Sequence, residues 1–143
     1  MTRSLSIFAA LTAILITVSS NAFAEWQRLG IQNGEWTEWN PSEVVKDGPF
    51  KVTVIRLVYR PPRIDRSVSP TRKVHQHKWK FEIECDSKIV RQISYIALDD
   101  QGEMIIGNVR STDYMKFQKP NGTWIPGYDQ FVVANKICDP TRQ

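Results

Sequence analysis

Two cysteines are the residues in this 143-residue chain whose type and position most readily suggest chemistry. Cys85 lies in KFEIECDSK and Cys138 in ANKICDP. A thiol can act as a nucleophile, bind a metal or form a disulfide. A catalytic thiol needs a base within reach, and the chain has only 2 histidines. Zinc usually takes four ligands, and two cysteines with a distant His-x-His pair match the usual spacings poorly. The choice therefore depends on the compartment in which the chain folds.

Residues 1–24 have the layout of a secretory signal. Arg3 supplies a positive charge, the run from Leu5 to Val18 is almost entirely apolar, and AFA at 22–24 places small residues before the predicted cleavage point. The alternative is a membrane anchor, but the apolar run is shorter than the roughly 20 residues that span a bilayer. No cysteine stands where a lipoprotein carries its lipid. We therefore expect an exported protein without a membrane anchor, in the periplasm, at the cell surface or secreted.

Cleavage of this signal leaves one domain, residues 25–143. The domain has 119 residues and a net charge of +3, because the signal removes one base and no acid. In an exported chain an even number of cysteines favours a disulfide. A Cys85–Cys138 bridge would close a loop of about 53 residues and contribute roughly 4 kcal/mol in the chain-entropy model. We therefore predict that the two cysteines are structural.

Alternating and β-branched runs predict the central strands. FKVTVIRLVYR at Phe50–Arg60 favours a strand. Three prolines and scattered serines in residues 61–75 predict an exposed loop. A second strand is expected from His77, with one face apolar and the other charged. The apolar face would carry Trp79, Phe81, Ile83 and Cys85, and the charged face Lys78, Lys80, Glu82 and Glu84.

Turn signals and a helical spacing complete the predicted fold. Asn40-Pro41 should begin one helical turn that ends at Asp47-Gly48. The segment from Asp99 to Gly102 separates two apolar runs and predicts a hairpin tip. Apolar residues three or four apart predict a helix over Asp129–Cys138, although Val132-Val133 leaves a strand open. The fold class expected is α+β: a single twisted antiparallel sheet with a C-terminal helix packed on it.

A basic segment is the most distinctive surface feature of the sequence. Residues 60–80 carry a local net charge of +6, with Asp65 as the one acid. Such a patch attracts polyanions and acidic proteins; the alternative is a solvated loop that keeps the protein soluble. Nucleic acid is not expected, because no aromatic platforms are interleaved with these bases. The predicted contact residues are Arg60, Arg63, Arg66, Arg72, Lys73, Lys78 and Lys80.

The remaining polar groups predict no catalytic centre, metal site or cofactor. His75 and His77 lack a visible third ligand and are interpreted as surface histidines at a loop–strand junction. Glu82 and Glu84 should form ion pairs on the open strand face, since a glycosidase would need a cleft. Asp99-Asp100 lacks the spacing of a calcium loop. The sequence contains no Gly-rich phosphate loop, G-x-S-x-G or H-E-x-x-H motif, so we do not expect an enzyme.

The order of several short motifs resembles the surface-adhesin protein E family of small exported bacterial domains. The shared features are a tryptophan soon after the signal (Trp26), EWTEWNPSEVVKDG before a long strand, FEIECDSK, RQISYIALDDQGE, and a closing run from Trp124 through Pro126 to Cys138. Together they cover nearly all of residues 25–143. The chain departs from the family in lacking a lipidation cysteine and in its strongly basic 61–75 segment.

This resemblance implies an antiparallel sheet of about six strands, a C-terminal helix and a Cys85–Cys138 disulfide. It also implies a non-catalytic adhesin that binds host matrix proteins such as vitronectin and laminin, or another acidic partner. No binding residue is transferred from the family, because no short binding motif matches. The alternative from a different class is a periplasmic envelope-maintenance or inhibitor protein that recognises another bacterial protein through its sheet edge.

Overall fold

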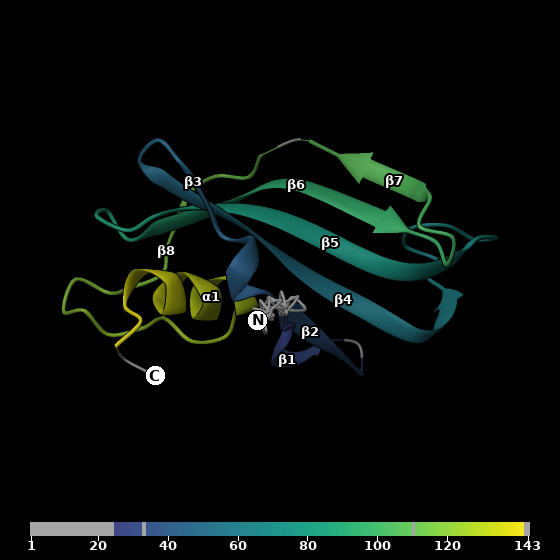
Figure 1. The fold of residues 1–143 in the computed structure, drawn as a ribbon, viewed down its shortest axis with the longest axis horizontal. Coiled ribbons are helices and arrows are strands. Elements are labelled where there is room, and N and C mark those ends of the chain that lie inside the picture. Colours follow the sequence, from purple (N-terminus) through teal and green to yellow (C-terminus); the bar gives the residue numbers. More distant parts are fainter. Residues whose placement is uncertain (1–24, 33, 110, 142–143) are drawn as a thin grey trace, which may run out of the picture.

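A computed structural model describes residues 25–32, 34–109 and 111–141 of the chain. The predicted signal at residues 1–24 lies outside the described residues. The main sheet is antiparallel and curled, with the strand order β1-β2-β4-β5-β6-β7 (Figure 1). Its strands are β1 (Gln27–Gln32), β2 (Glu35–Trp39), β4 (Phe50–Ile64), β5 (Lys73–Glu84), β6 (Ile89–Leu98) and β7 (Met104–Asn108). The α+β fold with about six strands is confirmed.

Two short strands and two helical elements complete the described fold. β3 (Val45–Asp47) pairs with β4, and β8 (Met115–Lys116) pairs with β6. A 3-10 turn, η1, spans Pro41–Glu43. Helix α1 spans Asp129–Cys138, the range predicted from the sequence. No helix in the described part of the chain is long and apolar enough to cross a membrane.

Period-two alternation fixes the inner face of the sheet, which we define as the face on which α1 packs. Ile55 on β4 and Phe81 and Ile83 on β5 are buried in one cluster with Phe131 of the helix. This confirms the predicted apolar face of β5. On β4, Leu57 continues the alternation of Ile55, so the inner face extends along the strand. Lys78 and Lys80 alternate with this set and therefore lie on the outer face.

The predicted loop at residues 61–75 is too long. β4 continues to Ile64 and β5 already begins at Lys73, so only residues 65–72 connect the strands. The pairing of β4 with β5 shifts between Val58 and Arg63, which leaves Pro61-Pro62 inside an irregular stretch. A proline cannot donate a ladder hydrogen bond, and such a bulge is where a strand tolerates it. The prolines therefore mark a bulge and not the end of the strand.

The predicted helical turn after Asn40 is correct at its start and wrong at its end. The Asn40 side chain accepts a hydrogen bond from the backbone N–H of Ser42, and Pro41 opens the turn. Residues Val45–Asp47 then form β3, which turns back into β4 through Gly48 at φ +56°. β-branched valine favours the extended backbone over a helix here.

Helix α1 covers only one end of the inner face. Figure 1 shows it beneath the part of the sheet near β8, while the far ends of β4, β5 and β6 extend past it together with β7. The Cys85–Cys138 disulfide joins its last residue to the end of β5, with an S–S distance of 2.01 Å, and confirms the predicted bridge. A second small cluster, built around Leu57 and Tyr59, lies along the uncovered part. The fold therefore leaves a stretch of inner face open beside the helix.

Candidate ligand-binding groove

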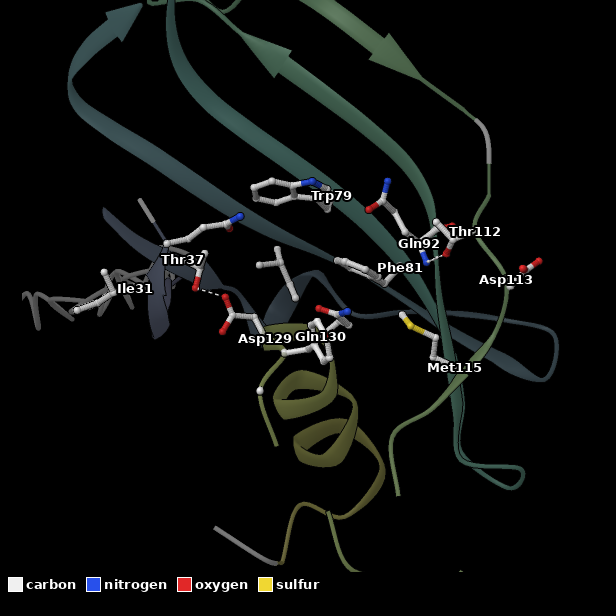
Figure 2. Close-up of a pocket in the computed structure, with 14 residues that line it drawn as sticks. Ile31, Thr37, Trp79, Phe81, Gln92, Thr112, Asp113, Met115, Asp129 and Gln130 are labelled. Atoms are coloured by element: carbon white, nitrogen blue, oxygen red, sulfur yellow. Dashed lines mark hydrogen bonds between the residues drawn. The ribbon is translucent and has the colours of Figure 1, made fainter. Parts of the chain in front are cut away.

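Two adjoining hollows lie along the open stretch of the inner face. The main hollow, of about 590 Å³, lies between the start of α1, strands β1 and β2, and strands β5 and β6 (Figure 2). The second, of about 270 Å³, is lined by aromatic rings and is called the aromatic hollow. Gln32 and Trp79 line both. We refer to the two together as the groove; the main hollow falls within the roughly 300–1,000 Å³ typical of small-ligand pockets.

Strand β5 supplies the apolar wall of the main hollow. Trp79 and Phe81 of this strand line the hollow, together with Ile55 of β4 and Met115 of β8 (Figure 2). Phe81 is buried, whereas Trp79 remains half-buried because no helix covers its end of the strand. A half-buried tryptophan in a hollow offers a large rigid apolar surface to a ligand.

A polar contact fixes the opposite wall. The Thr37 hydroxyl donates to the Asp129 carboxylate at 2.5 Å, tying β2 to the first turn of α1. Gly30 of β1 permits this approach, because a Cβ there would lie 2.8 Å from Asp129 Oδ1. An acid in the first turn also complements the positive end of the helix. The mouth of the main hollow is thus held by groups from β1, β2 and α1.

A stack of rings forms the aromatic hollow. The His77, Trp79 and Tyr95 rings contact one another, with centroids 5.7 Å apart for His77–Trp79, 5.8 Å for His77–Tyr95 and 5.9 Å for Trp79–Tyr95. Tyr59 meets the His77 ring edge-on at 5.4 Å. These residues come from three adjacent strands, β4, β5 and β6, whose inner faces the register aligns. The wall is therefore rigid and continuous with Trp79 of the main hollow.

The prediction that His77 is a surface histidine is wrong. Its exposure is 5 %, and its Nδ1 lies 2.8 Å from the Tyr95 hydroxyl. Its Nε2 lies 3.2 Å from Asp65 Oδ2. Burial lowers the pKa of His77 below its usual value and outweighs the opposing effect of Asp65. The apolar alternation of β5 was the missed signal, because His77 lies two residues before Trp79 on the same face.

The order of carboxylate, imidazole and hydroxyl in Asp65, His77 and Tyr95 is also that of a nucleophilic triad. Burial raises the pKa of Tyr95 to about 12, with smaller contributions from Asp65 and Tyr59. A higher pKa makes the hydroxyl harder to ionise, which is the opposite of what an activated nucleophile needs. The arrangement therefore favours a polar network that holds the aromatic wall in place.

Acidification should destabilise the protein through His77. In the unfolded chain the imidazole takes up a proton near pH 6.5, whereas its lowered pKa keeps it neutral when folded. The stability gained by burying His77 as a neutral imidazole is thus fully present above pH 6.5 and is lost as the pH falls below that value. We expect the free energy of unfolding, measured by urea titration, to fall between pH 7 and pH 5. His77→Phe should flatten this slope. An unaltered slope in His77→Phe would contradict the assignment.

The seven predicted basic residues lie on β4, on β5 and in the turn between them. Three are paired with acids: Arg60 with Glu38, Arg63 with Glu35, and Arg72 with Asp99 and Glu103. Lys78 and Lys80 lie on the outer face of β5, and Arg66 and Lys73 are exposed at the β4–β5 turn. A contact surface made of this segment remains a prediction.

The other predicted polar groups have local partners. Glu82 forms an ion pair with Arg91 on the neighbouring strand, as expected, at 2.5 Å. Glu84 accepts hydrogen bonds from the backbone of Asp86 and Ser87 in the next turn. Asp99 lies at the predicted hairpin tip and accepts from the backbone N–H of residues 101 and 103. Among the described residues there is no group of three or more His, Cys, Asp or Glu side chains that could hold a metal ion.

Neither a family model nor a curated protein sequence matches the chain. The resemblance to the surface-adhesin protein E family therefore rests on the sequence motifs and stays a prediction. Functional conclusions must come from the groove and from the placement of charges around it.

Proposed function

We propose that this chain is an exported, non-catalytic binding module and that its ligand binds in the groove. One observation supports this most strongly: α1 covers only one end of the inner face, and Trp79 lines both hollows beside it. A small domain normally covers the apolar face of its sheet. An uncovered stretch lined by aromatic rings is typical of a binding site.

The groove suits binding because its walls are preorganised. Rings from adjacent strands stack on one another, and the Thr37–Asp129 contact fixes the far side. A rigid site loses little conformational entropy when a ligand binds. This supports recognition without chemistry, in keeping with the raised pKa of Tyr95.

Substituting Trp79 tests whether the groove is the binding site. Trp79→Ala removes the ring shared by both hollows. We expect binding to immobilised vitronectin or laminin to weaken about thirtyfold, the loss that corresponds to a central aromatic contact of about 2 kcal/mol. Trp36→Ala is the matched control, because Trp36 is 43 % exposed and lies over Arg28 outside the groove. Equal effects of the two substitutions, with both variants folded by circular dichroism, would contradict the proposal.

The second candidate is a periplasmic protein that recognises another bacterial protein through a sheet edge. The observation in its favour is β7, the last strand of the sheet, which exposes Met104 and Ile106 at 61 % and 44 %. Edge strands with exposed apolar residues can pair with a strand of another protein. Protease digestion of intact and permeabilised cells separates the two candidates. Digestion on intact cells supports the adhesin, and digestion only after permeabilisation supports the periplasmic protein.

A further inference from the structure

The charge of the main hollow is opposite to that of the chain. The whole chain carries +4, yet the charged side chains that line the main hollow are Asp113 and Asp129. Among its described lining residues there is no lysine or arginine. The aromatic hollow adds the carboxylate of Asp65, which stays ionised because hydrogen bonds from Ser67 lower its pKa. The main hollow is thus acidic in a basic protein, whereas at the aromatic hollow Arg63 over the Tyr59 ring adds a positive charge.

From this we propose that the main hollow binds an extended peptide segment in which lysine or arginine side chains flank an apolar side chain. The inference rests on the proposed function, because it names the class of ligand that the groove takes. The proposed ligand is basic, whereas the basic segment predicts an acidic partner. The cations of this ligand would contact Asp113 and not the arginines of the β4–β5 turn.

The lining of the main hollow matches both parts of such a segment. Ile55, Trp79 and Phe81 form an apolar wall that can hold an aliphatic or aromatic side chain. The side-chain amides of Gln92 and Gln130 also line the hollow and can each donate to and accept from a peptide backbone (Figure 2). Apolar contact with a few placed polar groups is how small-ligand sites combine affinity with orientation.

The two carboxylates of the main hollow have different roles. Asp129 Oδ2 already accepts a hydrogen bond from the Thr37 hydroxyl, and its Oδ1 lies against Gly30. Asp129 therefore contributes mainly its negative charge to the hollow. Asp113 is exposed at the rim, and in the described part of the chain no hydrogen bond or ion pair engages its carboxylate. Its carboxylate points away from Trp79 and Phe81 in Figure 2, so a long cationic side chain of a ligand would meet it at the outer rim.

One ring of the aromatic hollow, that of Tyr59, already contacts a cation in a neighbouring hollow that Arg63 lines. The guanidinium of Arg63 lies over the Tyr59 ring, 4.0 Å from the centroid. His77 is neutral at pH 7, since its pKa is lowered by burial, and so does not repel a second cation. A guanidinium or ammonium over an aromatic face is attracted by the negative face of the ring. The face of Trp79 in the main hollow offers the same kind of contact.

Three capped pentapeptides of leucine alternating with lysine, glutamine or glutamate test the inference, with binding measured by isothermal titration calorimetry. We expect the lysine peptide to bind most tightly and the glutamate peptide most weakly. The preference for lysine over glutamine should shrink as salt is raised, because exposed charges are screened. Asp113→Asn should reduce that preference about two- to fivefold, the range of an exposed ion pair. The matched control is Asp100→Asn, which makes the same charge change at the exposed hairpin tip.

The outcomes separate this inference from the proposed function. If all three peptides bind equally and Trp79→Ala weakens each of them, the groove binds ligands but the cationic preference is wrong. If Trp79→Ala has no effect on any peptide, or none binds, both the groove and its preference are overturned. Tighter binding of the glutamate peptide, lost when Arg63, Arg66, Arg72 and Lys73 are changed to serine, would instead assign recognition to the basic segment.

Discussion

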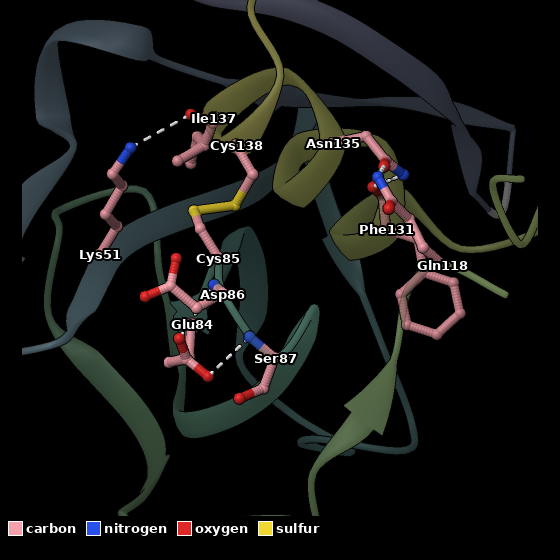
Figure 3. Close-up of a disulfide and its surroundings, with 10 residues drawn as sticks. All are labelled: Lys51, Glu84, Cys85, Asp86, Ser87, Gln118, Phe131, Asn135, Ile137 and Cys138. Atoms are coloured by element: carbon pink, nitrogen blue, oxygen red, sulfur yellow. Dashed lines mark hydrogen bonds between the residues drawn. A yellow bond between two sulfur atoms is a disulfide. The ribbon is translucent and has the colours of Figure 1, made fainter. Parts of the chain in front are cut away.

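Replacing Cys85 and Cys138 with alanine is expected to lower the free energy of unfolding by about 4 kcal/mol. The disulfide closes a loop of 53 residues that contains strands β6, β7 and β8, so its loss frees much of the unfolded chain. It also joins the last residue of α1 to the end of β5 (Figure 3). A domain of this size has about 5–15 kcal/mol of stability in total. Loss of the bridge therefore removes a large share of the total stability.

Urea unfolding followed by circular dichroism and tryptophan fluorescence measures this loss. The wild-type protein under reducing conditions is the control, and it should unfold at the same urea concentration as Cys85→Ala/Cys138→Ala. Agreement between them shows that the effect comes from the crosslink and not from the alanines. A loss below about 1 kcal/mol would mean that the unfolded chain is already restricted without the bridge, because the entropic estimate assumes a free chain.

Local patterns were sufficient to predict the elements that alternate strictly or have clear caps. The apolar positions of β5 fixed its inner face because a strand repeats every two residues, and the helix followed from Phe131, Ala134 and Ile137. The length of β4 was missed because proline normally ends a strand. Here a bulge between Val58 and Arg63 accommodates Pro61-Pro62, and the strand continues. Local propensity does not reveal a bulge that depends on pairing with β5.

The candidate site could not be predicted from the sequence, since its parts meet only through tertiary structure. Thr37, Trp79 and Asp129 are far apart in the chain and meet because α1 docks beside β1 and β2. The basic segment, by contrast, suggested a binding surface from the sequence alone. Its charges are close in sequence, but alternation on β5 sends Lys78 and Lys80 to the outer face, and ion pairs engage Arg60 and Arg72. Charge density along a chain is thus a poor guide to charge density on a face.

Removing the Phe131 side chain is expected to cost about 3–5 kcal/mol, the usual loss for a buried phenylalanine. Phe131 is 3 % exposed and packs in the cluster between α1 and the sheet. It follows Asp129 and Gln130, which line the main hollow, so its packing also positions one wall of the groove. Tyr128→Ala is the control, because that ring is 58 % exposed and contacts Phe131 edge-on at 5.2 Å. It should cost about 0.5–1.5 kcal/mol.

Combining Phe131→Ala with the cysteine replacements tests whether the disulfide is what keeps α1 on the sheet. If the crosslink acts only on the unfolded chain, the two losses add to within about 0.5 kcal/mol. If α1 leaves the sheet once Cys138 is released, Phe131→Ala then costs little, because its side chain is already exposed. Strong coupling would mean that one wall of the groove depends on oxidation of the two cysteines. Additivity would mean that the contacts of Phe131 and the Thr37–Asp129 hydrogen bond hold the helix without the bridge.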